Sequence, residues 1–240
     1  MSTGIKKQII IVGLIVAVLA VAGLGLLYYY QKQGLIKVFP TVQEKTQAQA
    51  LIIDRSKFKA PTGTSAEDFE KRIAELETYK GKILKDSKDL TSWLYFAAIK
   101  SFLNDHQGAA DAWEIAYQIQ PADFRISQNL GNVYQYFLKD YIKSESNYLK
   151  VLALRPDFTL AYEGLMDLYR YNMKENSVKY EPLVLQAIAE DKANAAEYYG
   201  NLVEFFAETD QVKAKTYLAE VRKLKPANAE SLLTDYPALK

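Results

Sequence analysis

Four polar side chains near the middle of this 240-residue chain are the best placed, by type and spacing, to bind a ligand. Gln128 and Asn132 lie four residues apart, and Asp167 and Arg170 lie three apart, so each pair would share one face of a helix. Amide side chains donate and accept hydrogen bonds, which suits them to the backbone of an extended peptide. Asp167 or Arg170 would add a charge contact, and we expect Asn132 and Arg170 to point into solvent. By type and spacing, these residues are therefore candidates for contacts with a peptide.

The residue types that other chemistry requires are scarce. The chain has no cysteine, which excludes disulfides, thiolate metal sites and cysteine nucleophiles. His106 is the only histidine, and its place between Asp105 and Gln107 in an expected turn suggests a surface residue rather than a base or a metal ligand. We find no glycine-rich phosphate loop and no paired metal-ligand motif. The sequence thus predicts a protein that is not an enzyme, with no cofactor and no metal.

Charge is unevenly distributed along the chain, although the net charge is only +1. Residues 1–88 hold 14 basic and 8 acidic residues, whereas residues 89–240 hold 16 basic and 21 acidic ones. Nucleic acid requires a basic surface, so the acidic second part argues against a nucleic-acid partner. We expect a protein or peptide partner and no small-molecule substrate.

A 34-residue pattern of large, small and proline positions begins at Leu90 and supplies the helices that would carry these side chains. Positions 4, 7, 8, 20, 24, 27 and 32 hold, in order, Trp93, Phe96, Ala97, Ala109, Trp113, Ala116 and Pro121. In this pattern the chain resembles a tetratricopeptide repeat (TPR) protein. It departs from the pattern at position 11, where Lys100 replaces the usual aromatic residue.

Two further sequence features, a proline position and a helix-capping position, recur at nearly the same period. The proline position recurs at spacings of 35, 36 and 34 residues in Pro121, Pro156, Lys192 and Pro226. Short side-chain acceptors stand before each expected first helix, at spacings of 34, 34, 37 and 34 residues, in Asp89, Asp123, Asp157, Asn194 and Asn228. Such acceptors would cap the free N–H groups of a helix start and contribute about 1 kcal/mol each. The resemblance therefore covers residues 89–228.

The resemblance implies an all-α fold, a right-handed α-solenoid of TPR helix hairpins. Most of the 18 tyrosines would then pack between helices. One residue is inserted in the second repeat before Asp140, and the first helix of the fourth repeat departs from the pattern by one position. The expected parts are a packing helix within 65–88, four repeats at about 90–123, 124–158, 159–194 and 195–228, and a capping helix and tail at 229–240.

The resemblance also implies where a ligand would bind, because TPR proteins commonly bind ligands along the concave face formed by their first helices. In the second and third repeats, the corresponding positions are Gln128, Asn132, Gln135, Tyr136, Glu163, Asp167, Arg170 and Tyr171. The alternative is that these side chains simply face solvent. The family's carboxylate clamp requires lysines where Gln128, Glu163 and Asp167 stand, so we do not expect capture of a chaperone C-terminus.

An apolar segment near the N-terminus predicts a membrane anchor. Ile9 to Leu27 are 19 residues without a charge, which as a helix would span roughly 28 Å. We assign a short tail at 1–8, a transmembrane helix at 9–30 and a linker at 31–64. The alternative is a signal peptide that is cleaved after Ala22.

The expected location is the cell membrane, with a single pass. The tail of eight residues with two lysines would stay in the cytoplasm and the repeats would lie outside it. The sequence thus predicts a membrane-anchored scaffold that binds a partner in its concave groove. Two alternatives are a secreted TPR binding protein and an accessory subunit of an envelope enzyme or translocation complex.

Overall fold

The computed structural model describes residues 42–240 of the chain. The chain divides into two compact units, residues 1–49 and 50–240, and only the second is largely within the described part. The predicted tail, the predicted transmembrane helix and the start of the linker lie outside it. Within residues 42–240, no helix combines the length and the hydrophobicity needed to cross a bilayer.

The described residues form helices and turns, with no strand. The linker region holds α2 (Val42–Ala50) and the short η1 (Arg55–Lys57). The α-helices that follow are α3 (Ala66–Lys85), α4 (Leu90–Phe102), α5 (His106–Ile119), α6 (Phe124–Asn132), α7 (Tyr141–Leu154), α8 (Thr159–Asp167), α9 (Tyr180–Glu190), α10 (Ala195–Phe206), α11 (Gln211–Leu224) and α12 (Pro226–Asp235). Four shorter turns complete the unit, namely η2 (Val133–Leu138), η3 (Leu168–Asn172), η4 (Lys174–Lys179) and η5 (Lys192–Asn194), and η6 (Pro237–Leu239) ends it.

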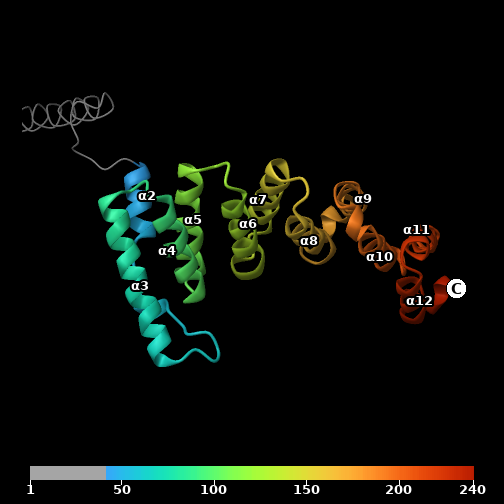
Figure 1. Ribbon diagram of the computed structural model, residues 1–240, viewed down its shortest axis with the longest axis horizontal. Coiled ribbons are helices and arrows are strands. Elements are labelled where there is room, and N and C mark those ends of the chain that lie inside the picture. The colour runs from blue at the N-terminus through green and yellow to red at the C-terminus, as the bar shows by residue number, and fades with distance from the viewer. Residues whose placement is uncertain (1–41) are drawn as a thin grey trace, which may run out of the picture. The chain divides into compact units, whose positions relative to one another are not determined.

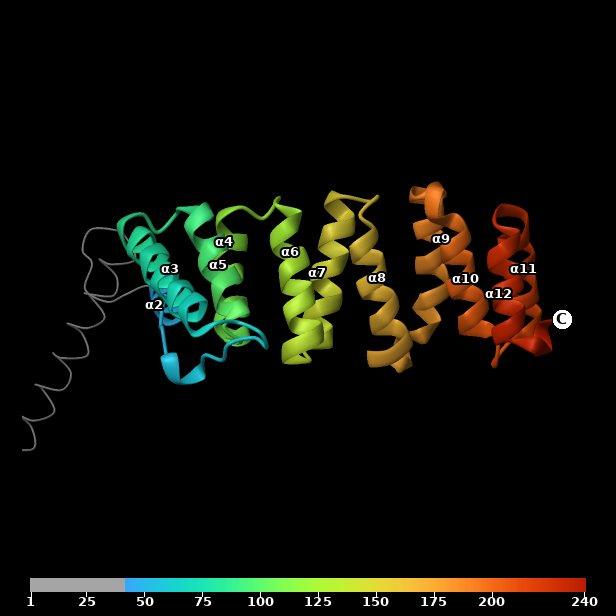
Figure 2. The same cartoon turned by 60° about the horizontal axis from the view of Figure 1, so that its bottom comes forward.

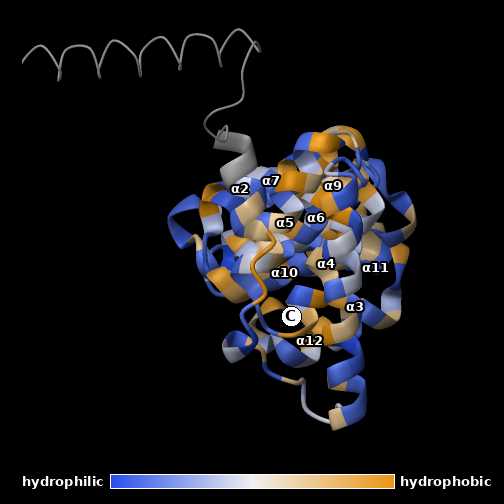
Figure 3. Ribbon diagram, turned by 90° about the vertical axis from the view of Figure 1, so that its left-hand side faces the viewer, coloured by the Kyte–Doolittle hydropathy of each residue, from blue (hydrophilic) through white to orange (hydrophobic). Residues whose placement is uncertain are grey.

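Residues 50–240 form an α-solenoid, because successive helix pairs stack along one direction in chain order (Figures 1 and 2). The pairs are α4 with α5, α6 with α7, α8 with α9, and α10 with α11. The helices that can be followed in Figure 3, such as α3 and α11, carry both hydrophobic and hydrophilic residues, as helices with one packed face must. Among the aromatic side chains, Trp93, Tyr148, Tyr162 and Tyr180 are fully buried. The right-handed sense of the solenoid stays a prediction.

Aspartates cap several helices, as the spacing predicted, but not all of the expected caps form. The carboxylate of Asp89 accepts a hydrogen bond from the N–H of Ser92, and that of Asp123 accepts from Arg125. The expected caps at Asp157, Asn194 and Asn228 are wrong. Asn194 precedes α10, but its side chain forms no capping hydrogen bond. The carboxylate of Asp157 binds the guanidinium of Arg155 instead, and Asn228 lies inside α12, which begins at Pro226.

The first helices of repeats 2 and 3 both finish in a π-helical turn, η2 after α6 and η3 after α8. A π-helical turn holds an additional residue without breaking the helix. In repeat 2 it accommodates the inserted residue that the sequence places before Asp140. Lys139 then ends the turn in the left-handed conformation, with φ of 58°.

A contact between a tyrosine, a glutamate and a lysine joins the second repeat to the first. The hydroxyl of Tyr134, at position 11, donates a hydrogen bond to Glu114 of the preceding α5. The Nζ of Lys143 on α7 lies 3.8 Å from the same carboxylate and 4.7 Å from the centre of the Tyr134 ring. Burial and the Glu114 hydrogen bond both raise the pKa of Tyr134 above its ordinary value, so the hydroxyl stays protonated.

The same contact recurs at the next repeat junction. Tyr169 donates a 2.6 Å hydrogen bond to Glu145, which also accepts a 2.7 Å bond from Lys179. Burial would raise the pKa of Glu145, but the bonds from Lys179 and Tyr169 outweigh it and leave the pKa lowered. A group with a lowered pKa stabilises the fold above its unfolded pKa, near 4.3, and that contribution is lost as the pH falls through the folded pKa.

We therefore expect a pH-dependent effect of Glu145→Gln. At pH 7 the substitution should cost about 1.5–3 kcal/mol, as expected for hydrogen bonds to a charged group. The difference from the wild type should shrink as the pH falls below about 4.3, because the wild-type carboxylate then becomes protonated. Urea denaturation between pH 7 and pH 3 measures it. Glu220→Gln, at a surface ion pair on α11, is the control, and a difference that stayed constant with pH would contradict this account.

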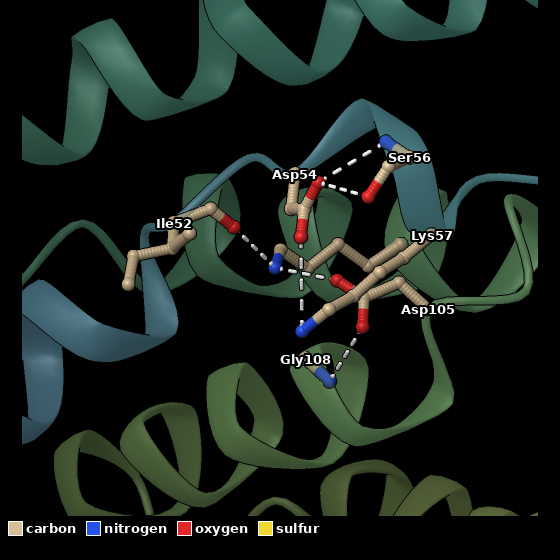
Figure 4. A network of polar contacts seen from close by, with 7 residues as sticks. Ile52, Asp54, Ser56, Lys57, Asp105 and Gly108 are labelled. Atoms are coloured by element: carbon tan, nitrogen blue, oxygen red, sulfur yellow. Dashed lines mark hydrogen bonds and ion pairs between the residues drawn. The ribbon is translucent and has the colours of Figure 1, made fainter.

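Lys100, the departure from the TPR pattern at position 11, is buried, with 2% of its surface exposed. Its ammonium donates hydrogen bonds to the Ile52 carbonyl at 2.7 Å and to the Asp105 carboxylate at 2.8 Å (Figure 4). Asp105 in turn accepts a hydrogen bond from the N–H of Gly108 and thereby caps α5. A lysine thus stands where an aromatic residue would pack, because it binds the backbone of the preceding segment.

That segment, residues 51–60, lies against the end of α4. The N–H of Lys59 donates to the Leu103 carbonyl at 2.9 Å, and Asn104 donates to the Lys59 carbonyl at 3.1 Å. Phe58 is buried with the core of the first repeat. Residues 51–60, assigned to the linker from sequence, are therefore part of the folded unit.

Candidate functional site

The eight predicted groove residues all lie on the first helices of repeats 2 and 3, in α6 and η2 or in α8 and η3. They differ in accessibility. Tyr136, Glu163 and Tyr171 are exposed, and Asn132, Asp167 and Arg170 are half-buried. Gln128 and Gln135 are only 8% and 1% exposed, so these two amides are part of the interior rather than a free surface.

The buried amides form a hydrogen-bonded chain. Gln128 Nε2 donates to Asn132 Oδ1 at 3.2 Å, and Gln135 Nε2 donates to Asn172 Oδ1 at 3.2 Å. The Tyr148 hydroxyl lies 2.8 Å from both Asn132 Oδ1 and Gln135 Oε1, and its single hydrogen is donated to one of them at a time. The expectation that Asn132 points freely into solvent is therefore wrong, because its oxygen serves this chain.

Tyr148 reaches these amides from the second helix α7 by passing between two first helices. A Cβ added at Gly131 of α6, or at Gly164 of α8, would lie 2.5 Å from the Tyr148 ring. Both positions therefore need glycine as long as the ring occupies this space. The tyrosine links the core of the solenoid to the first-helix surface and fixes the side chain of Asn132. The amide nitrogen of Asn132 has no hydrogen-bond partner within residues 42–240 and remains a donor for a ligand.

Charged side chains continue this surface on α8. The Tyr136 hydroxyl donates to Asp167 at 3.2 Å, and burial together with the charge of Asp167 raises the pKa of Tyr136 to about 12. Glu163 is exposed for the most part, but its partial desolvation and the nearby carboxylates of Glu197 and Asp167 raise its pKa. Arg170 forms an ion pair with Glu204 at 3.2 Å, so the expectation that its side chain is free in solvent is also wrong.

A cavity of about 510 Å³ opens where the first helices of repeats 3 and 4 end. Two of the predicted residues, Arg170 and Tyr171, line it, and Phe205, Glu208 and Tyr236 line its other sides. A second cavity, of about 320 Å³, lies along α10 and α12 and shares Glu204 with the first. The first cavity thus places the aromatic rings of Tyr171, Phe205 and Tyr236 beside charged side chains, among them the Arg170–Glu204 ion pair.

The sequence did not identify groove residues on α10, because the first helix of repeat 4 departs from the repeat pattern by one position. The Nζ of Lys213 lies 4.7 Å above the ring of Phe206, just as Lys143 lies above Tyr134 at position 11 of repeat 2. Phe206 is thus the position-11 residue, which moves the start of the repeat to Ala196. In this register the positions that match the predicted groove residues of repeats 2 and 3 include Glu197, Gly200, Glu204 and Glu208, which line the two cavities. The remaining position, Ala207, is buried and lines neither cavity.

His106 is not the plain surface residue that the sequence suggested. Its ring stacks on Phe137 of η2 with centroids 3.8 Å apart, and its Nδ1 is buried without a hydrogen-bond partner. Burial lowers the pKa of His106, and the charge of Asp105 only partly offsets this. His106 therefore packs as a neutral ring between the first two repeats. Within residues 42–240, no group of three potential metal ligands occurs.

Comparison with known proteins gives similarity at the level of structure only. No family model and no curated protein sequence matches the chain. YrrB, described as a TPR protein with an unusual peptide-binding site, is 18% identical over 69% of this chain and 86% of its own, with a TM-score of 0.49. The C-terminal part of a TPR repeat-containing protein from Cytophaga hutchinsonii is 22% identical over 66% of this chain, with a TM-score of 0.50. The match spans 65% of that structure. With the four helix pairs of residues 90–224 and the likeness to the Cytophaga hutchinsonii structure, the chain has the fold of the tetratricopeptide repeat proteins.

Proposed function

We propose that this protein is a non-catalytic TPR scaffold that binds an extended peptide segment of a partner protein. The binding surface, called here the first-helix groove, comprises Asn132, Tyr136, Glu163, Tyr171 and the cavity beside Tyr171. The single observation that carries the proposal is this 510 Å³ cavity, because it lies at predicted ligand positions and within the range of about 300–1,000 Å³ typical of ligand sites.

The side chains of the groove supply complementary contacts to a peptide. The free amide nitrogen of Asn132 can donate to a backbone carbonyl, and the Tyr148 hydrogen bond already holds that amide in place. One peptide side chain can enter the cavity between Tyr171 and Phe205. Each hydrogen bond contributes about 0.5–1.5 kcal/mol net, so several contacts are needed and micromolar affinity is expected.

Tyr171→Ala is the substitution that tests the groove with the least disturbance of the fold, because the side chain is 58% exposed. We expect partner capture to fall about tenfold or more, equivalent to at least 1.4 kcal/mol, since the cavity loses one aromatic wall. The melting temperature should stay the same. A pull-down and a melting curve measure these, with Leu185→Ala on α9 as the matched control. Unchanged capture by Tyr171→Ala would show that the partner binds elsewhere.

Membrane anchoring is the second part of the proposal. It is supported by the uncharged run Ile9 to Leu27 and places the protein as a single-pass membrane protein with its repeats outside the cytoplasm. The secreted form cleaved after Ala22 and the accessory subunit of an envelope complex remain the alternative functions.

Carbonate extraction of native membranes distinguishes anchoring from secretion. We expect the full-length chain to remain in the membrane pellet, because about 20 apolar residues suffice to span a bilayer. The intact mass should include residues 1–22. A soluble product that begins after Ala22 would support the secreted form and contradict the anchor.

A further inference from the structure

A cavity of about 280 Å³ lies between α5 and α7, which are the second helices of the first two repeats, rather than along the first helices. Glu114 and Tyr117 line it from α5, Lys143, Asn147 and Lys150 line it from α7, and Leu130 of α6 also lines it. It shares no lining residue with the cavities of the first-helix groove. It is also separate from the amide chain around Tyr148.

Asn147, which lines this cavity, has a buried side-chain oxygen without a hydrogen-bond donor. The side chain is 94% buried, since only 6% of its surface is exposed, and its Oδ1 has no hydrogen-bond partner. Its Nδ2 donates to the Lys143 carbonyl at 2.8 Å, which fixes the orientation of the amide, because the flipped form would set two oxygens against each other. Buried acceptors are nearly always satisfied, so this oxygen calls for a donor.

Lys150 gives the cavity an uncompensated positive charge. Lys143 has two acidic neighbours, with Glu114 at 3.8 Å and Asp140 at 3.9 Å. The ammonium of Lys150 instead lies over the Tyr117 ring, 4.6 Å from its centroid, and forms no salt bridge within residues 42–240. Two lysines and one glutamate line the cavity, so its lining carries a net charge of +1. A single negative charge matches it better than a phosphate dianion does.

We propose that this cavity binds the C-terminal end of a peptide chain, with its carboxylate on Lys150 and its last amide N–H on Asn147 Oδ1. A C-terminal residue supplies this pair of groups, one anion and one adjacent donor. The volume is slightly below the range typical of small-ligand sites, so it holds one or two residues rather than a long segment. Asn147 Oδ1 is buried in the free protein, so the ligand must displace the side chains that cover this oxygen in order to reach it. The site is thus a second, independent recognition point beside the first-helix groove.

The probe is N-acetyl-Ala-Ala with a free carboxylate, and its C-terminal amide is the matched control ligand. We expect the free acid to shift the NMR signals of Asn147, Lys150 and Tyr117 saturably in the ¹⁵N-labelled full-length chain in detergent micelles. With one charged and one neutral contact, the dissociation constant should be on the order of a millimolar. The amide should bind at least fivefold more weakly.

Lys150→Met keeps the apolar stem over Tyr117 and removes the charge. It should weaken binding of the free acid about tenfold, whereas Lys223→Met on the exposed face of α11 should leave binding unchanged. Lys150→Gln is a second variant that tests the same charge if the first is unstable. Equal binding of acid and amide, or full binding by both Lys150 variants, would overturn the proposal. Competition by inorganic phosphate at equal concentration would also overturn it, in favour of a general anion site.

Discussion

Lys100→Met should lower the free energy of unfolding by about 3–5 kcal/mol, a large effect for a position that is usually aromatic in the repeat pattern. The loss arises because the Asp105 carboxylate is left buried without its 2.8 Å partner. The Ile52 carbonyl loses its 2.7 Å donor at the same time. Residues 51–60 should then detach from α4, and Lys57 and Lys59 should become sites of trypsin cleavage. Urea denaturation and limited proteolysis measure the two effects.

Two comparisons make this result specific. Lys223→Met, at a surface ion pair, should cost under about 1 kcal/mol. Adding Asp105→Asn to Lys100→Met should recover part of the stability, because the uncompensated charge is removed while asparagine still caps α5. A loss for Lys100→Met no larger than that for Lys223→Met would contradict the role assigned to this buried pair.

Tyr148→Ala should also cost about 3–5 kcal/mol, as large aromatic truncations in a core do. The ring is fully buried and fills the space left by Gly131 and Gly164, so its removal leaves a cavity between α6 and α8. The side chains of Asn132 and Gln135 would also lose the hydroxyl that both contact. Chemical denaturation of the purified protein measures the change.

Tyr148→Phe separates packing from hydrogen bonding. It keeps the ring but leaves a buried amide oxygen without a donor, which should cost about 1–3 kcal/mol. Partner binding in the first-helix groove should weaken as well, because Asn132 is no longer held in place. A loss for Tyr148→Ala no greater than that for Tyr148→Phe would mean that the ring does not fill the space between the two helices.

The α-solenoid could be predicted from sequence because its signals are local and repeated. Caps such as Asp89 and Asp123 and buried residues such as Trp93 act within one hairpin, so their spacing translates directly into structure. The role of Lys100 could not be predicted in this way. Its partner Ile52 lies 48 residues earlier, in a segment outside the repeat pattern, and no periodicity reports such a contact.

The placement of the candidate residues on first helices was predictable from sequence, but their accessibility was not. The register placed Gln128, Gln135 and Tyr171 on first helices, where the structure has them. It could not show that Tyr148 reaches through from α7 and binds Gln135, because that contact depends on two glycines in different helices. The π-helical turns also rotate the ends of α6 and α8, which a pattern based on regular helices does not represent.

Photo-crosslinking in native membranes tests the central claim, that a partner binds in the first-helix groove, most directly. A benzophenone amino acid would replace Tyr171 or Glu163 in the groove and, as controls, Leu154 or Leu185 on the second helices. All four side chains are exposed, so the substitutions should preserve the fold. We predict that the two groove positions crosslink to one short linear segment of a partner protein and that the control positions do not. Crosslinks to that partner from the second-helix positions alone would contradict the account.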